Sequence, residues 1–138
     1  MEALAKTDKN GRTRSLIGHS LDVANAAQSL ISNGLMQKRL ERAAGTTLTG
    51  IQSDRLAILA GFHDVGKALA GFQARISGES TTLPSGHVAE ALAALADASV
   101  QSILEPLFQW FGPDLIYSTI CHHGEPVPQD RYESLVSV

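Results

Sequence analysis

The sequence has one cysteine, few aromatic residues and no excess of positive charge, and each shortage excludes a class of protein. Because Cys121 is the only cysteine, the chain has no internal disulfide and suits a reducing compartment. Aromatic residues make up 5% of the chain and apolar residues 43%, so small aliphatic side chains must fill the core. The formal net charge of -3 gives no bulk electrostatic argument for nucleic-acid binding, although a bound metal would supply positive charge of its own.

Long apolar runs are also missing. No run reaches the roughly 20 residues that a membrane-spanning helix requires. The first 15 residues, MEALAKTDKNGRTRS, lack the apolar segment of a secretory signal. We therefore expect a cytoplasmic protein with no membrane partner. A length of 138 residues suits one domain, residues 1–138, with a core of its own.

What is present is helical periodicity, which predicts an all-α fold. The sequence shows no repeat, no low-complexity tract and no segment with strand periodicity. Residues 1–13 are polar and are expected to be loose, while residues 77–86 and the proline-containing tail from residue 125 are expected to be loops. Helices are expected over residues 15–31, 36–44, 49–64, 86–96, 99–111 and 113–123, with a short helix or turn over residues 67–73.

Local signals mark several helix boundaries. Thr49 and Gln52 have the spacing of a capping box, and Gly45 is a C-terminal stop. Pro113 stands at a permitted first-turn position, whereas Pro106 is expected to kink or restart its helix. The remaining expected N-caps are Ser85 and Ser99.

Apolar stripes on these helices predict the core. The two main stripes comprise Ile51, Leu56, Ile58, Leu59 and Phe62, and Ile103, Leu107, Phe108 and Phe111. Trp110 and Phe111 could stack a nucleobase, but a core or helix-junction role is expected. Cys121 is expected to be a buried core thiol and not a metal ligand. Basic residues 6–14 and 38–42 are candidates for contacts with DNA, and a solvated surface explains them equally well.

The stretch Phe62-His63-Asp64-Val65-Gly66-Lys67 places an imidazole, a carboxylate and an ammonium close together. The adjacent His63 and Asp64 can hold one metal ion, and the second oxygen of the carboxylate can bridge to another. Gly66 relieves steric crowding where the groups enter a cavity. A His-Asp pair alone is a weak signal, because such pairs are common on solvated surfaces.

The histidine inventory strengthens the signal. The five histidines are His19, His63, His87, His122 and His123, each in or beside an expected helix. They are too dispersed for a local metal finger and can meet only inside a helical bundle. Successive helical residues diverge by about 100°, so His122 and His123 can share a site only at a frayed helix end, which Gly124 supplies. The alternative is one or two buried histidines and several exposed ones.

The order of these pieces resembles the HD phosphohydrolase superfamily. The matching pieces are His19, the run His63 to Lys67, Gly71-Phe72-Gln73, His87 and His122-His123-Gly124. The chain is most similar to the N-terminal HD nuclease domain of the helicase-nuclease of type I CRISPR systems, over residues 15 to 125. The resemblance implies an HD-domain helical bundle around a histidine and aspartate metal site.

The same resemblance implies a site for two divalent transition metal ions. His19, His63 and Asp64 would hold one ion, and His87, His122 and His123 the other, with Asp64 bridging them. Imidazole-rich donor sets favour Mn, Fe, Co or Ni, with Mg or Zn as further candidates. Asp64 and Lys67 would be the catalytic residues, Lys67 neutralising charge on the phosphate or orienting water. The alternative for Lys67 is a surface ammonium.

One departure from the family pattern concerns the first metal. The family completes it with a second Asp on a helix well beyond the His-His-Gly segment, whereas this sequence ends at Val138. Asp130 is not assigned to that role, because it follows Pro126 and Pro128 in an expected loop. We therefore expect either the N-terminal part of a larger protein or a short relative that lacks the last helices.

The leading functional hypothesis is a metal-dependent nuclease that hydrolyses phosphodiester bonds of single-stranded DNA in CRISPR interference. The resemblance implies a helicase portion, on the same or a partner chain, and a guide-RNA surveillance complex as partners. Two alternatives stay open. One is an HD phosphohydrolase acting on nucleotides, and the other is an inactive metal-binding or docking module.

Overall fold

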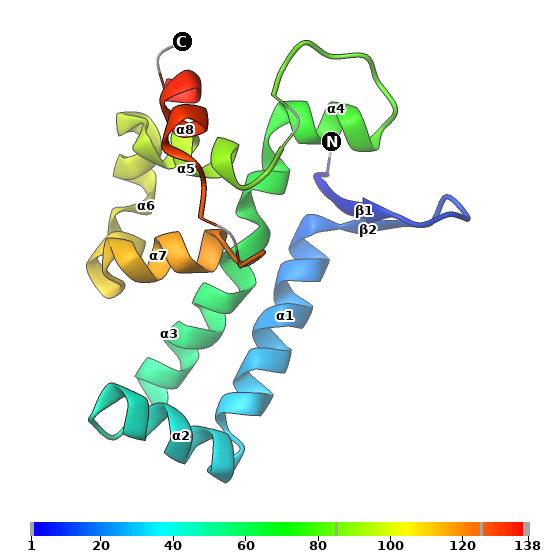
Figure 1. Cartoon of the computed structure of the whole chain (residues 1–138). Helices are drawn as coiled ribbons and strands as arrows, with labels where there is room; N and C mark the ends of the chain where they lie inside the picture. The colour runs from blue at the N-terminus through cyan, green and yellow to red at the C-terminus, as the bar shows by residue number, and fades with distance from the viewer. Residues whose placement is uncertain (1, 85, 125, 137–138) are drawn as a thin grey trace.

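The computed structural model describes residues 2–84, 86–124 and 126–136, which form a helical bundle preceded by a small β-hairpin (Figure 1). The elements in chain order are β1 (Leu4–Thr7), β2 (Thr13–Ser15), α1 (Leu16–Ile31), α2 (Gly34–Ala44), α3 (Gly50–Gly61), the 3-10 helix η1 (Phe62–Ala68), α4 (Ala70–Ile76), α5 (Ala89–Ala96), α6 (Ala98–Trp110), α7 (Pro113–Ile120) and α8 (Gln129–Val136). The predicted all-α fold class is confirmed.

The prediction of a loose N-terminal segment is wrong. Strands β1 and β2 pair antiparallel, with Lys6 opposite Arg14 and Thr7 opposite Thr13. The carboxylate of Asp8 accepts hydrogen bonds from the backbone N–H groups of Asn10 and Arg12, at 2.8 and 3.0 Å. Gly11 follows in the left-handed region, with φ of 76°. An Asn-Gly pair between short strands is a hairpin signal that strand periodicity alone does not reveal.

Helices α1 and α3 lie side by side, and α2 joins them at the end far from the hairpin (Figure 1). The predicted capping box is present, because the Thr49 side chain accepts from the Gln52 N–H and the Gln52 side chain accepts from the Thr49 N–H. Gly45 ends α2 in the left-handed conformation, with φ of 67°. These local signals therefore place α1 and α2 nearly as predicted, with α2 beginning two residues earlier. Helix α3 begins as predicted but ends at Gly61, so the prediction that it extends to Asp64 is wrong.

The chain changes from α to 3-10 geometry at the His-Asp stretch. Helix α3 ends at Gly61, and η1 carries His63, Asp64 and Lys67. Gly66 explains the close packing here, since a Cβ at this position would lie 1.8 Å from the backbone oxygen of His87. The backbone of the segment that carries His87 can therefore approach η1 only at a glycine.

The core lies where α3, α5, α6 and α7 meet, and it is aliphatic as the composition predicted. Its buried members are Leu59, Ala91, Leu95, Phe111, Ile116 and Ile120. The prediction that Ile51, Ile58 and Ile103 are buried is wrong, since they are 65%, 49% and 76% exposed. Ile51 and Ile58 are seven residues apart and so share one helix face, about 100° away from the buried Leu59.

Several boundaries in the second half differ from the predictions. Asp97, and not Ser99, caps α6, because its carboxylate accepts from the Ser99 N–H at 2.8 Å. Helix α6 continues through Pro106 without ending. Helix α5 begins at Ala89, later than expected, and Ser85 lies outside the described residues.

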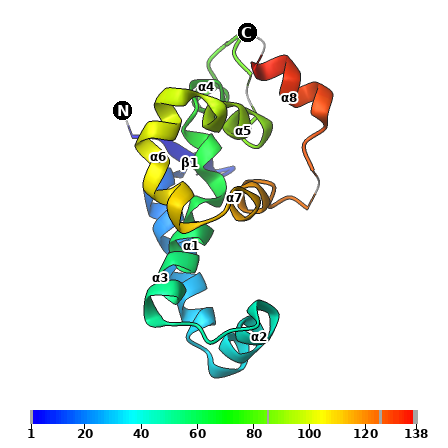
Figure 2. The same ribbon diagram turned by 90° about the vertical axis from the view of Figure 1, so that its left-hand side faces the viewer.

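The tail expected as a loop contains α8, which places Asp130 in a helical first turn. Helix α8 lies beside α5 and packs against it (Figure 2). The guanidinium of Arg131 binds Glu90 across this contact. Two prolines before Gln129 thus delay the helix and do not prevent it. Within the described residues, no single helix is long and apolar enough to cross a membrane. Helices α5 and α6 taken together have the required length and apolar composition, but a 96° bend separates them.

Candidate metal centre

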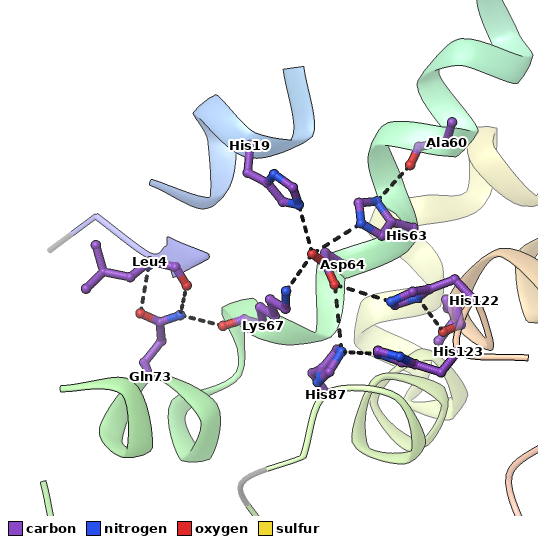
Figure 3. Close-up of polar contacts among 11 residues, drawn as sticks. Leu4, His19, Ala60, His63, Asp64, Lys67, Gln73, His87, His122 and His123 are labelled. Atoms are coloured by element: carbon purple, nitrogen blue, oxygen red, sulfur yellow. Dashed lines mark hydrogen bonds and ion pairs between the residues drawn. The ribbon is translucent and has the colours of Figure 1, made fainter. Parts of the chain in front are cut away.

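Four histidines surround one buried carboxylate, that of Asp64, and the fifth, His123, lies against His87 (Figure 3). The contributing elements are α1 with His19, η1 with His63 and Asp64, the segment before α5 with His87, and the turn after α7 with His122 and His123. Asp64 is 2% exposed, whereas its histidine neighbours are partly accessible. The structure therefore brings together every residue that the sequence singled out for metal binding.

The donor atoms form two groups of three. In each group the ligand atoms lie within 4.8 Å of one another, and the groups are His19, His63 and Asp64, and His87, His122 and His123. Oδ2 of Asp64 lies 3.1 Å from Nε2 of His19 and 3.2 Å from Nε2 of His63. Oδ1 lies 3.7 Å from Nε2 of His87 and the same distance from Nε2 of His122. Asp64 thus has one oxygen directed to each group.

The carboxylate of Asp64 has an unsatisfied atom. Oδ1 is fully buried and accepts no hydrogen bond among the described residues. A buried carboxylate oxygen without a donor is costly, and a metal ion is one way to satisfy it. Two imidazole-rich groups that share a carboxylate are also the donors that divalent transition metals prefer. The residues present therefore fit a divalent metal site.

Two backbone carbonyls fix the orientation of the histidine rings. Nδ1 of His63 lies 2.9 Å from the oxygen of Ala60, and Nδ1 of His122 lies 3.1 Å from the oxygen of Ile120. Since a carbonyl oxygen can only accept, each Nδ1 carries the proton and donates. Each Nε2 then directs its lone pair toward Asp64, the arrangement found in metal-binding histidines.

Burial keeps several imidazoles neutral. Burial lowers the pKa of His19, of His87 and of His122 below the ordinary value of 6.5. The positive charge of Lys67 lowers the pKa of His87 further, and the neighbouring His123 does the same for the pKa of His122. A neutral imidazole has a free lone pair, so these residues are ready to bind a metal at neutral pH.

The pKa of Asp64 reflects two opposing effects. Burial acts to raise it, but the hydrogen bond from Lys67 and the electrostatic interactions with His63 and Lys67 lower it overall. Nζ of Lys67 lies 2.7 Å from Oδ2. In a 3-10 helix, residues three apart stand one above the other, so η1 places Lys67 directly over Asp64. Asp64 is therefore ionised at neutral pH.

Two supporting residues were known from the sequence only as part of the Gly71-Phe72-Gln73 run. The Gln73 amide accepts from the Leu4 N–H at 2.8 Å and donates to the backbone oxygens of Leu4 and Lys67. Phe72 is buried, and its ring meets that of His87 edge-on at 5.5 Å. Gln73 thus ties β1 to η1 (Figure 3), and Phe72 packs against a candidate ligand.

Other candidates raised by the sequence lie outside the two groups. Among the described residues, neither group contains Cys121 or Asp130. Cys121, predicted to be a buried core thiol, is only half-buried. Phe111 is buried as expected, while Trp110 is 46% exposed and lies under the guanidinium of Arg55 at 5.0 Å.

Comparison with known proteins supports this picture. The family model described as Cas3, HD domain, matches residues 4–137. No curated protein and no solved structure matches the chain. The family match spans nearly the whole sequence and includes all six residues of the two donor groups. The chain therefore belongs to the Cas3 HD-domain family, the HD-type nuclease and hydrolase domain of type I CRISPR defence.

Proposed function

We propose that the chain hydrolyses phosphodiester bonds of single-stranded DNA during CRISPR interference, with two divalent transition metal ions as cofactors. The observation that carries the proposal is the pair of donor groups around Asp64, whose buried Oδ1 has no hydrogen-bond partner among the described residues. The imidazole-rich donor set favours Mn, Fe, Co or Ni, with Mg or Zn as further candidates. The family is one of HD-type nucleases, and nucleases cleave phosphodiester bonds.

The residues divide the work between two positions. His19, His63 and Asp64 would hold one ion, and His87, His122 and His123 the other, with Asp64 contributing to both. When bound, such ions activate water at neutral pH and stabilise charge on the attacking and leaving oxygens of phosphate. The backbone carbonyls of Ala60 and Ile120 keep the rings of His63 and His122 in the productive tautomer.

Lys67 acts beside these positions. Its ammonium holds Asp64 in the ionised state and stands 2.7 Å from the carboxylate, on a side chain that is 19% exposed. A cation at this place can bind a non-bridging phosphate oxygen, so charge that develops there during displacement is stabilised. Asp64 and Lys67 are therefore the proposed catalytic residues.

The partners in this proposal follow from family membership. A helicase portion, on the same or a partner chain, would deliver the single strand, and a guide-RNA surveillance complex would recruit both. The reaction would take place in the cytoplasm. The organisation of residues 1–138 as one HD-type domain stays a prediction.

A cleavage assay tests the proposal. The full chain is loaded separately with Mn, Fe, Co and Ni and incubated with end-labelled single-stranded DNA. Wild type should cut the strand, and Asp64→Asn should cut at least about 100-fold more slowly, since removal of supporting groups alone costs 10- to 100-fold. Asp54→Asn is the matched control, because Asp54 is exposed on α3.

Two results would contradict the proposal. In the first, Asp64→Asn cuts as fast as wild type. In the second, wild type hydrolyses deoxynucleoside triphosphates or cyclic dinucleotides and leaves DNA intact. That second result would favour the nucleotide phosphohydrolase.

A further inference from the structure

A cavity of about 290 Å³ opens directly beside the group formed by His87, His122 and His123. The residues that shape it include His87, His123, Val88, Pro126, Pro128 and Arg131. The cavity is thus lined by two candidate metal ligands, His87 and His123, by apolar side chains and by the guanidinium of Arg131. None of the roles proposed above uses this space.

The guanidinium of Arg131 is held from behind. Its Nη2 donates to Oε1 of Glu90 at 3.1 Å. Glu90 is 9% exposed, and its Oε2 is buried without a hydrogen-bond partner among the described residues. Gly86 packs against this carboxylate, since a Cβ there would lie 2.2 Å from Oε2. Glu90 is therefore fixed on both sides and orients Arg131.

Arg131 keeps donors for a ligand. A guanidinium has five N–H donors in a planar fork, and the pairing with Glu90 uses Nη2. The side chain of Arg131 is 56% exposed, so the remaining donors can reach an anion in the cavity. Arginine in this geometry binds phosphate with two parallel hydrogen bonds.

The size of the cavity limits the ligand. About 290 Å³ is at the lower end of the range for small-molecule sites. Such a volume suits one nucleotide unit and not a base pair. The apolar surface of Val88, Pro126 and Pro128 can cover a sugar and the face of a base, and the phosphate of the same unit can reach Arg131.

We propose that this cavity binds the nucleotide next to the scissile phosphodiester, with its phosphate on Arg131 and its base against Val88 and the two prolines. The inference rests on the proposed nuclease function, because it takes the scissile phosphate to lie at the histidine groups. Arg131 is then a substrate-binding residue and Glu90 a positioning residue. The competing explanation is structural: Arg131 only ties α8 to α5.

A binding experiment tests the proposal directly. Fluorescein-labelled oligothymidylate with hydrolysis-resistant phosphorothioate links is titrated with the full chain loaded with Mn, and anisotropy gives the Kd. Arg131→Met should raise the Kd about tenfold, the worth of one charged hydrogen bond to phosphate. Arg131→Lys should give an intermediate value. Arg55→Met, which removes one positive charge from α3 outside residues 6–14 and 38–42, should stay within about twofold of wild type.

A double variant serves as the control for loss of folding. Arg131→Met leaves the Glu90 carboxylate buried without its cation, whereas Glu90→Gln/Arg131→Met removes that charge too. Both variants should bind the oligonucleotide weakly. Both should keep the wild-type metal content, which shows that the histidine groups still assemble.

The outcomes separate this proposal from the nuclease function. Unchanged Kd values for the Arg131 variants, with DNA still cut by wild type, would overturn the cavity proposal alone. Equal loss of metal and of DNA binding would also overturn it, since only the structural role predicts that pattern. Arg131-dependent DNA binding without cleavage would overturn the nuclease function and, with it, the position beside a scissile phosphodiester, while the contact of Arg131 with DNA would stand.

Discussion

The ammonium of Lys67 lies 2.7 Å from Oδ2 of Asp64, the carboxylate oxygen that also faces His19 and His63. One anion is therefore shared between a permanent cation and two imidazole rings. The 3-10 geometry of η1 makes this possible, because an α-helix would turn residues 64 and 67 about 60° apart.

Removing the Lys67 charge should affect metal binding and turnover in opposite directions. Lys67→Met frees Oδ2 of Asp64 and removes a repelling cation, so the affinity for Mn should rise. Turnover of DNA should fall about 10- to 100-fold, because no cation then stabilises the phosphate oxygen. Metal titration by calorimetry and cleavage kinetics measure the two effects. Parallel loss of affinity and turnover would contradict this role.

The metal-free protein should lose stability as the pH falls. The pKa values of His19, His87 and His122 lie below 6.5 in the folded chain, so the unfolded chain binds more protons as the pH falls through 6.5. The pKa of Asp64 lies below 3.8, so a further loss follows as the pH falls through 3.8. Protonation of the histidines and protonation of Asp64 therefore both lower the stability of the folded chain.

Urea unfolding in the presence of a chelator measures this dependence. The unfolding midpoint should decrease from about pH 7.5 to about pH 5, the range in which an ordinary imidazole gains its proton. His122→Gln should make the unfolding midpoint depend less on pH in this range. A midpoint that stays constant or rises toward low pH would show that the imidazoles are not held neutral.

Gly66 should tolerate no side chain. Gly66→Ala places a methyl group 1.8 Å from the His87 backbone oxygen, so η1 and the segment before α5 must separate. We expect a loss of about 3 kcal/mol in the free energy of unfolding, the upper range for overpacking. Gly50→Ala is the matched control, because a Cβ there meets nothing within 4 Å. Equal stability of the two variants would show that the close approach is absent.

Gln73 should link the hairpin to the metal centre. Gln73→Glu keeps the shape of the side chain but cannot donate to the backbone oxygens of Leu4 and Lys67. Hydrogen exchange of the β1 and β2 amides should accelerate, and Mn affinity should fall about tenfold, as with other groups that orient ligands. Gln37→Glu on α2 is the control. Slow exchange and normal Mn affinity in Gln73→Glu would contradict the link.

The sequence predicted the parts whose signals are local. The Thr49–Gln52 capping box and the Gly45 stop are short-range hydrogen-bonding patterns, and both are present. The convergence of the histidines came from the order of motifs, which spacing alone left open. The hairpin was missed because its strands are too short for periodicity, and α8 because prolines precede it.

What the sequence could not predict depends on long-range packing. Which face of α3 is buried is decided by α1 and α7, and so Ile58 is exposed while Leu59 is not. The pairing of Glu90 with Arg131 joins residues 41 positions apart, and neither has a motif around it. Gln73 likewise reaches Leu4 across 69 positions.

The metal content of the purified chain tests the central claim most directly. After loading with Mn and removal of free ion, elemental analysis of wild type should give close to two ions per chain, and Asp64→Ala should lose most of both. His19→Ala and His123→Ala should each lose one, because the two residues belong to different donor groups. A wild-type chain that binds no Mn, Fe, Co or Ni, or an Asp64→Ala chain that binds as much as wild type, would contradict the account.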